Sequence, residues 1–149
     1  MCIRDRLNLV GSSNADNKEI LWKFINKFHK EISPSEYPIL NGLTEYAINY
    51  FKDKVEPNKK FKKPNSEEKK ALENLVLKLK EIDQSLKPEE IQTFVYSTGK
   101  ENGYEKNLRD WFKLIYEVVF GEENGPRMGY FISFFGLNET IELINEKIK

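Results

Sequence analysis

The sequence predicts an all-α protein, a helical bundle of about seven helices joined by short loops. Apolar residues recur at helical spacing along most of the chain, and no stretch shows the sustained alternation of a β-strand. Prolines and glycines fall where helices of ordinary length would start and stop. The 149 residues, 39% hydrophobic and 32% charged, allow one core or two small lobes, which we expect to meet near residues 56–66.

Two helices are predicted before residue 56. Asn14 or Asp16 can cap the first helix. Its apolar residues then share one side, which Trp22 widens: Ile20, Leu21, Phe24, Ile25 and Phe28. Two prolines in residues 33–38 break this helix. The second helix follows, with a stripe that we expect to be buried: Leu40, Leu43, Tyr46, Ala47, Tyr50 and Phe51.

The middle of the chain predicts a loop and two further helices. Residues 56–65 lack any apolar period and are predicted as the loop. Ser66 opens the helix with the clearest amphipathic period, formed by Leu72, Leu75, Val76, Leu79 and Ile82. Pro88 opens the next helix, which ends at Gly99 before a turn at Asn102-Gly103. Its inward residues are predicted to be Ile91, Phe94 and Val95.

Three more helices are predicted at the C-terminal end. Asn107 can cap the first of them, and Gly121 closes it. Pro126 starts a short, very apolar helix that Gly136 terminates. Asn138 caps the last helix, whose buried positions are predicted to be Ile141, Ile144 and Ile148.

Composition excludes several classes of protein. The 24 basic and 24 acidic side chains cancel, so a nucleic acid would have to bind at a local basic patch. The one cysteine, Cys2, excludes an intramolecular disulfide, and the one histidine, His29, excludes a histidine cluster, so we predict no metal site. Apolar runs are too short to span a bilayer, so we predict no membrane contact. A cytoplasmic protein is expected.

Residues 1–6, Met-Cys-Ile-Arg-Asp-Arg, look unlike the rest of the chain. They resemble a translated sequencing-adapter remnant at the end of an assembled fragment. We interpret them as non-native, so that the helical region proper covers residues 7–149.

The segment 52–63 is the first candidate for RNA binding. Six lysines against two acids give it a local charge of +4, and Phe61 lies among the lysines. A mobile cationic loop with an aromatic ring can neutralise phosphates and stack on a base. The alternative is an ordinary solvated loop. The candidate residues are Lys59, Lys60, Phe61, Lys62 and Lys63.

Arg127 is the second candidate. It follows Pro126 at a predicted helix start, where the positive end of the helix dipole disfavours a cation unless an anion is bound nearby. The alternative is an internal salt bridge to Glu122 or Glu123. The glycine-rich corner around it consists of Gly125, Pro126 and Gly129, whose glycines allow close backbone approach.

Two weaker groups surround these candidates. Arg109 and Lys113 lie four residues apart on one helix and can face RNA, although such charges are usually just solvated. An aromatic cluster is interpreted as core rather than as a ligand platform. Its members are Trp111, Phe112, Tyr116, Tyr130, Phe131, Phe134 and Phe135.

Three motifs in this region carry a family resemblance. They are Trp111-Phe112, the run Tyr-Glu-Val-Val-Phe-Gly at 116–121, and the run Gly-Pro-Arg-Met-Gly at 125–129. In this order they resemble the C-terminal, anticodon-binding region of class I lysyl-tRNA synthetases. The likeness extends along residues 7–149 and includes Tyr50-Phe51-Lys52-Asp53 followed by a basic loop.

The resemblance implies a helix cage that holds the anticodon arm of a lysine-accepting tRNA. The family attaches lysine to tRNA with ATP through an N-terminal Rossmann-type catalytic domain, whose paired-histidine signature is absent from this chain. The chain is therefore expected to be a catalytically silent C-terminal piece with no catalytic residue and no cofactor of its own. Its expected partners are tRNA and the missing catalytic domain, which would use the ATP.

Two alternatives remain open at this point. The Gly125-Pro126-Arg127 corner is also similar to that of glutamyl-tRNA synthetases, which share the scaffold and read a different anticodon. The chain can also be a helical docking module for another protein, which predicts an exposed apolar groove.

Overall fold

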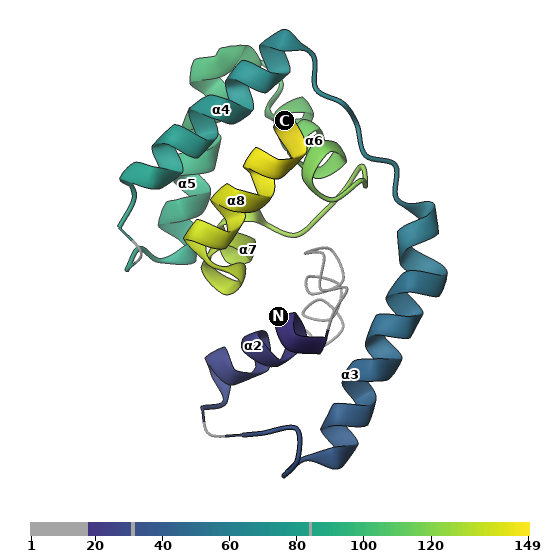
Figure 1. The fold of residues 1–149 in the computed structure, drawn as a ribbon. Coiled ribbons are helices and arrows are strands. Elements are labelled where there is room, and N and C mark those ends of the chain that lie inside the picture. The colour runs from purple at the N-terminus through teal and green to yellow at the C-terminus, as the bar shows by residue number, and fades with distance from the viewer. Residues whose placement is uncertain (1–17, 31, 84) are drawn as a thin grey trace. The chain divides into compact units, whose positions relative to one another are not determined.

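The computed structural model describes residues 18–30, 32–83 and 85–149, and the regular elements within them are all helical (Figure 1). Seven α-helices lie in these residues, which confirms the all-α prediction for the described part of the chain. The chain divides into two units, residues 1–59 and 60–149. The interpretation of residues 1–6 and the cap at Asn14 or Asp16 lie outside the described residues.

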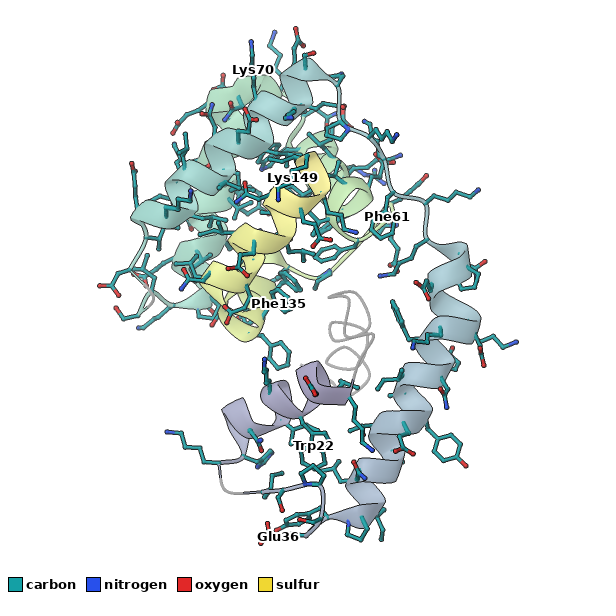
Figure 2. The ribbon with its side chains drawn as sticks, in the orientation of Figure 1. Trp22, Glu36, Phe61, Lys70, Phe135 and Lys149 are labelled. Carbon is teal, nitrogen blue, oxygen red and sulfur yellow. The ribbon has the colours of Figure 1, made fainter. Side chains whose placement is uncertain are left out.

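The described part of unit 1 contains two α-helices and two short helical turns. Their bounds are α2 (Lys18–Phe28), α3 (Pro38–Tyr50), the π-helical turn η1 (Phe51–Val55) and the 3-10 turn η2 (Glu56–Asn58). Trp22 of α2 is buried, and its Nε1–H donates to Asn41 Oδ1 of α3 at 3.3 Å (Figure 2). An ion pair between Lys18 and Glu45 also joins the two helices.

The buried side of α3 agrees only in part with the prediction. Phe51 is buried as predicted, but Thr44 and Ile48, which are outside the predicted stripe, are buried too. Leu43, Tyr46 and Tyr50 of the predicted stripe are exposed, so that part of the prediction is wrong. Apolar residues surround most of α3, so the apolar pattern does not determine which side is buried. The contact of Trp22 with Asn41 shows the side on which α2 packs.

Unit 2 contains five α-helices around one core. Their bounds are α4 (Ser66–Glu81), α5 (Pro88–Gly99), α6 (Leu108–Val119), α7 (Met128–Phe135) and α8 (Leu137–Ile148), with the turn η3 (Lys100–Tyr104) between α5 and α6. The predicted apolar faces of α4 and α8 are buried, as expected. On α5, Ile91 and Val95 are buried, but Phe94 is 38% exposed, so that part of the prediction is wrong.

α4 and α5 begin at Ser66 and Pro88 as predicted, whereas the last two helices begin at other residues than predicted. The side chain of Asn65 caps α4. α7 begins at Met128 rather than at Pro126, because the backbone of Arg127 is extended (φ −58, ψ 120). α8 follows directly on Gly136, whose φ of +119 suits glycine, so Asn138 lies inside the helix.

The ring of Trp111 joins α6 to α5. It is fully buried, and its Nε1–H donates to the carbonyl oxygen of Val95 at 3.0 Å. Gly99 lies against the indole, since a Cβ there would be 2.5 Å from the ring. The indole therefore requires a glycine at this point of α5.

In unit 2, α5 and α7 pack closely against each other at Gly129. A Cβ at this position would lie 2.0 Å from the carbonyl oxygen of Pro88. The Gly129 N–H donates to Gln92 Oε1 at 2.8 Å, which adds a polar contact to the crossing. A backbone oxygen cannot swing aside as a side chain can, so only glycine fits here.

The corner before α7 is closed by Tyr116 of α6. Its hydroxyl donates to the carbonyl oxygen of Pro126 at 2.8 Å. Gly125 packs against the same ring, where a Cβ would lie 2.6 Å from Cδ1. Burial raises the pKa of Tyr116 to about 12, so the phenol stays protonated as a donor at ordinary pH.

We expect Gly129→Ala to destabilise unit 2 by about 2 kcal/mol, because the added methyl group separates α5 from α7. Urea unfolding in a Trp22→Phe background isolates the fluorescence of Trp111, since the chain has two tryptophans. Ser133→Ala, at an exposed position of the same helix, should leave the unfolding free energy unchanged within about 0.5 kcal/mol. Equal changes in unfolding free energy in the two variants would contradict the close packing of α5 against α7 at Gly129.

We expect Tyr116→Phe to change the pH dependence of stability. The pKa of Tyr116 is about 12 when folded and about 10 when unfolded, so its contribution is complete below pH 10 and is lost as the pH rises towards 12. The difference in unfolding free energy between wild type and variant should therefore shrink across that window. A difference that stays constant up to pH 12 would show that the phenol is not buried.

Candidate nucleic-acid interface

The predicted cationic loop is held against α6. We call residues 60–63 the basic strap. The Lys60 N–H donates to the carbonyl oxygen of Gly121 at 2.9 Å, and the Lys62 N–H donates to that of Glu117 at 3.0 Å. The carbonyls in the last turn of a helix have no partner within the helix, so a neighbouring segment can supply the donors. The strap is therefore fixed at its backbone, unlike the mobile loop that the sequence predicted.

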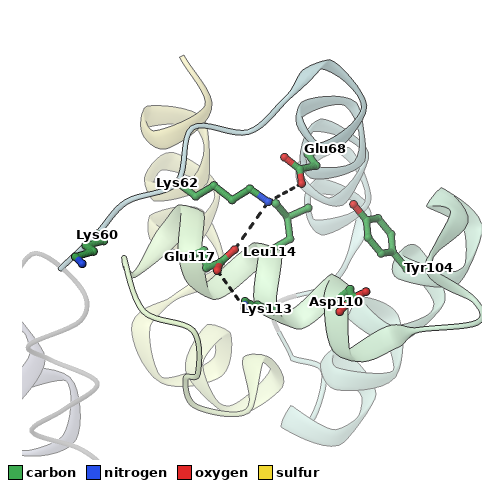
Figure 3. A pocket seen from close by; sticks show the side chains of 8 residues that line it. All are labelled: Lys60, Lys62, Glu68, Tyr104, Asp110, Lys113, Leu114 and Glu117. Carbon is green, nitrogen blue, oxygen red and sulfur yellow. Dashed lines mark hydrogen bonds and ion pairs between the residues drawn. The ribbon is translucent and has the colours of Figure 1, made fainter.

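Lys62 is paired with two acids of unit 2, although its side chain remains 41% exposed. Its Nζ lies 2.7 Å from Glu68 Oε1 and 3.9 Å from Glu117 Oε2 (Figure 3). The hydrogen bond to Glu68 raises the pKa of Lys62. Burial raises the pKa of Glu68, but the hydrogen bonds from Lys62 and from the Asn65 N–H outweigh it and lower that pKa overall. Both groups therefore stay charged at neutral pH, and their ion pair holds the basic strap against α4.

The ring of Phe61 also packs within unit 2. Lys147 of α8 places its Nζ 4.0 Å from the ring centroid, in a cation–π contact. The ring is still 44% exposed. In unit 1, Lys59 makes a similar contact, with its Nζ 5.0 Å from the centroid of the Phe51 ring. Phe61 and Lys59 therefore each already make a cation–π contact within their own unit.

The remaining strap lysines, Lys60 and Lys63, are exposed. Lys60 lies at the mouth of an open pocket of about 530 Å³ (Figure 3). The lining residues are Lys60, Lys62, Glu68, Tyr104, Asp110, Lys113, Leu114 and Glu117. Three lysines and three acids cancel, so the pocket itself has no charge preference for phosphate. Lys60, which lines the pocket and is exposed, and the exposed Lys63 are the strap amines available for RNA.

Arg109 and Lys113 differ in their surroundings. Lys113 lies 3.6 Å from Glu117 Oε1 and 3.6 Å from Glu123 Oε1, so its charge is shared with two acids. Arg109 is exposed in the first turn of α6. Of the two, Arg109 is the better placed to contact a ligand.

Arg127 is exposed at the residue before α7. Among the described residues, no carboxylate lies within 4.0 Å of its guanidinium, and Glu123 pairs with Lys113 instead. The hydrogen bond from the Tyr130 hydroxyl to Glu89 Oε1, at 2.6 Å, lowers the pKa of Glu89, and the charge of Arg127 lowers it further. Arg127 therefore has an acidic neighbour beyond ion-pair distance.

The start of α7 is a weaker anion site than the sequence predicted. The side chain of Gln92 already accepts the Gly129 N–H, one of the N–H groups that would face a phosphate. The extended backbone of Arg127 also places that residue outside the helix. Any contact of Arg127 with RNA would therefore come from its side chain.

Within the described ranges, no three histidine, cysteine, aspartate or glutamate side chains are grouped so that they could hold a metal ion. Nor does any helix there have the length and apolarity needed to cross a membrane. His29 is exposed near the end of α2.

Comparison with known proteins gives one consistent relationship. Over 142 residues, or 95% of its length, the chain is 38% identical to a lysine–tRNA ligase of Rickettsia bellii, and it is 37% and 35% identical to those of Rickettsia felis and Rickettsia massiliae. It spans 27% of the length of these relatives. No family model and no solved structure matches it. These similarities confirm the likeness to lysine–tRNA ligases that the sequence motifs indicated: the chain is similar to one segment of these proteins.

Proposed function

We propose that this chain is the tRNA-binding segment of a class I lysine–tRNA ligase and that it holds the anticodon arm. The observation that carries the proposal is the 38% identity over 95% of the chain. The sequence motifs at 111–129 and the helical architecture are in keeping with class I. In this proposal the rest of the ligase attaches lysine to tRNA with ATP in the cytoplasm, and this segment performs no chemical step.

The basic strap supplies a physical means of gripping RNA. Its backbone is already fixed by the hydrogen bonds to Glu117 of α6 and to Gly121 just after that helix, so little ordering of the chain would oppose binding. Lys60 and Lys63 then present two amines at set positions, and each phosphate that they neutralise releases counterions. Arg109, also exposed, is a third candidate. Lys62 and Lys113 contribute less because acids already pair with them.

The relatives favour lysine over glutamate. The relatives from Rickettsia bellii, Rickettsia felis and Rickettsia massiliae are named lysine–tRNA ligases, so we assign a lysine-accepting tRNA rather than the glutamate-accepting one of the alternative hypothesis. Comparing the affinities of the chain for the two tRNAs tests this choice. We expect the lysine-accepting tRNA to bind more tightly. Equal affinities for the two tRNAs would contradict the assignment to lysine.

We expect the double variant Lys60→Gln/Lys63→Gln to weaken binding of lysine-accepting tRNA and to reduce the slope of log affinity against log salt by about two. Filter binding across a salt series measures both. The matched control Lys70→Gln/Lys80→Gln removes the same charge from exposed positions of α4 and should change the slope little. If the two double variants behave alike, the strap is not the interface. If the wild-type chain binds no tRNA, the proposed function is wrong.

A further inference from the structure

Three asparagines of this chain are each followed by glycine, and their surroundings differ. The pairs are Asn41-Gly42, Asn102-Gly103 and Asn124-Gly125. An asparagine before glycine can form a ring with its own main chain, because the glycine nitrogen can attack the side-chain Cγ and no Cβ on the glycine obstructs it. The reaction needs a side-chain amide that can turn towards the main chain and a glycine N–H that is not held in a hydrogen bond.

The first pair is protected by its helix. Asn41 and Gly42 lie inside α3, where main-chain N–H groups donate to carbonyls one turn earlier. The Oδ1 atom of Asn41 also accepts the Nε1–H of Trp22, at 3.3 Å. The glycine nitrogen and the asparagine amide are therefore both held.

The second pair is protected at its side chain. Asn102 Oδ1 accepts from Asn74 Nδ2 at 2.8 Å, and Asn102 Nδ2 donates to the carbonyl oxygen of Thr98 at 2.8 Å. Both ends of the amide are held, although Gly103 lies in a turn with a φ of +90. The two hydrogen bonds must break before Cγ can approach the glycine nitrogen.

The third pair has neither kind of protection. Asn124 is exposed and lies between α6 and α7, outside the helices. Among the described residues, none forms a hydrogen bond with its side-chain amide, and none accepts the N–H of Gly125. The Cα of Gly125 packs against the ring of Tyr116, which holds the chain in place and leaves the nitrogen unpaired.

The local sequence does not explain this difference. Asn102 and Asn124 both lie in the order Glu-Asn-Gly, at residues 101–103 and 123–125. The reacting atoms belong to the asparagine and the glycine, which are the same in both. Local sequence alone therefore predicts similar reactivity at the two sites, and only the fold separates them.

We propose that Asn124 is a site of spontaneous deamidation, with water as the only co-reactant. The Gly125 nitrogen forms a bond to Cγ of Asn124 while the bond from Cγ to Nδ2 breaks, so a succinimide ring forms. The proton of the glycine nitrogen leaves with the amide group as ammonia. Water then opens the ring at Cγ, which gives aspartate, or at the main-chain carbonyl carbon, which gives isoaspartate.

Either product changes the corner before α7. A carboxylate replaces a neutral amide, three residues before the exposed Arg127. Isoaspartate also lengthens the main chain by one carbon just before Gly125, where even a Cβ would lie 2.6 Å from the Tyr116 ring. This inference does not depend on RNA binding, so the proposed function stands or falls separately.

Peptide mass spectrometry can follow the three sites in one experiment. Trypsin places each pair on its own peptide, at residues 31–52, 101–106 and 114–127. The folded chain is incubated at neutral pH and sampled over time, and an unincubated sample is digested alongside as the baseline. A chain kept unfolded in guanidinium chloride is the control for local sequence. Electron-transfer fragmentation distinguishes aspartate from isoaspartate.

We expect Asn124 to convert about thirtyfold faster than Asn102 in the folded chain, because two hydrogen bonds of ordinary strength must first break at Asn102. Asn41 should stay intact over the same period. In guanidinium chloride the rates at Asn102 and Asn124 should become similar. Asn74→Ala, at an exposed position of α4, removes one of the two hydrogen bonds and should raise the rate at Asn102 about fivefold, with the rate at Asn124 unchanged.

Several results would overturn the proposal. One is conversion of Asn41 or Asn102 as fast as that of Asn124 in the folded chain. Another is an Asn124 that stays intact in the folded chain while the unfolded chain converts, since its amide or the N–H of Gly125 would then be held. If neither chain converts, these pairs are not reactive and the proposal is equally wrong. An unchanged rate at Asn102 in Asn74→Ala would contradict the stated cause of the difference.

Discussion

Two hydrogen bonds between main-chain atoms determine what the cationic part of this protein can do. The N–H of Lys62 donates to the carbonyl of Glu117 in the last turn of α6, where carbonyls have no partner within the helix, and the N–H of Lys60 donates to the carbonyl of Gly121 just beyond that helix. Each such bond contributes about 1 kcal/mol, and together they turn a lysine-rich loop into a segment with a fixed path. Without them, the lysines would have to be ordered by the RNA itself, at a cost in affinity.

The position of the strap depends in turn on how unit 2 holds α6. Trp111 fastens α6 to α5 through the Val95 carbonyl, and Gly99 leaves room for the indole. At the other end, the hydroxyl of Tyr116 fastens α6 to the chain that leads into α7. The core thus supports a surface on which some lysines form ion pairs with acids and others are exposed. Lys62 holds the strap down, and Lys60 and Lys63 remain exposed.

Much of this architecture could be predicted from the sequence, and the misses have identifiable causes. The apolar residues of α4 recur on one side of the helix only, so the five positions predicted to be buried there are all buried. α3 is apolar on most sides, and only packing against α2 decides that Thr44 and Ile48 are buried. The candidate lysines are visible in the sequence, but which of them pair is not. The partners of Lys62 are Glu68, six residues away, and Glu117, which only the fold brings near.

The central claim is that fixed, exposed lysines on the strap contact tRNA. Acetylation of lysines in the folded chain, read by mass spectrometry with and without lysine-accepting tRNA, tests this most directly. The account predicts that tRNA protects Lys60 and Lys63 from the reagent while Lys70 and Lys80 on α4 remain as reactive as before. Uniform protection of all four lysines, or protection on α4 with none on the strap, would contradict it.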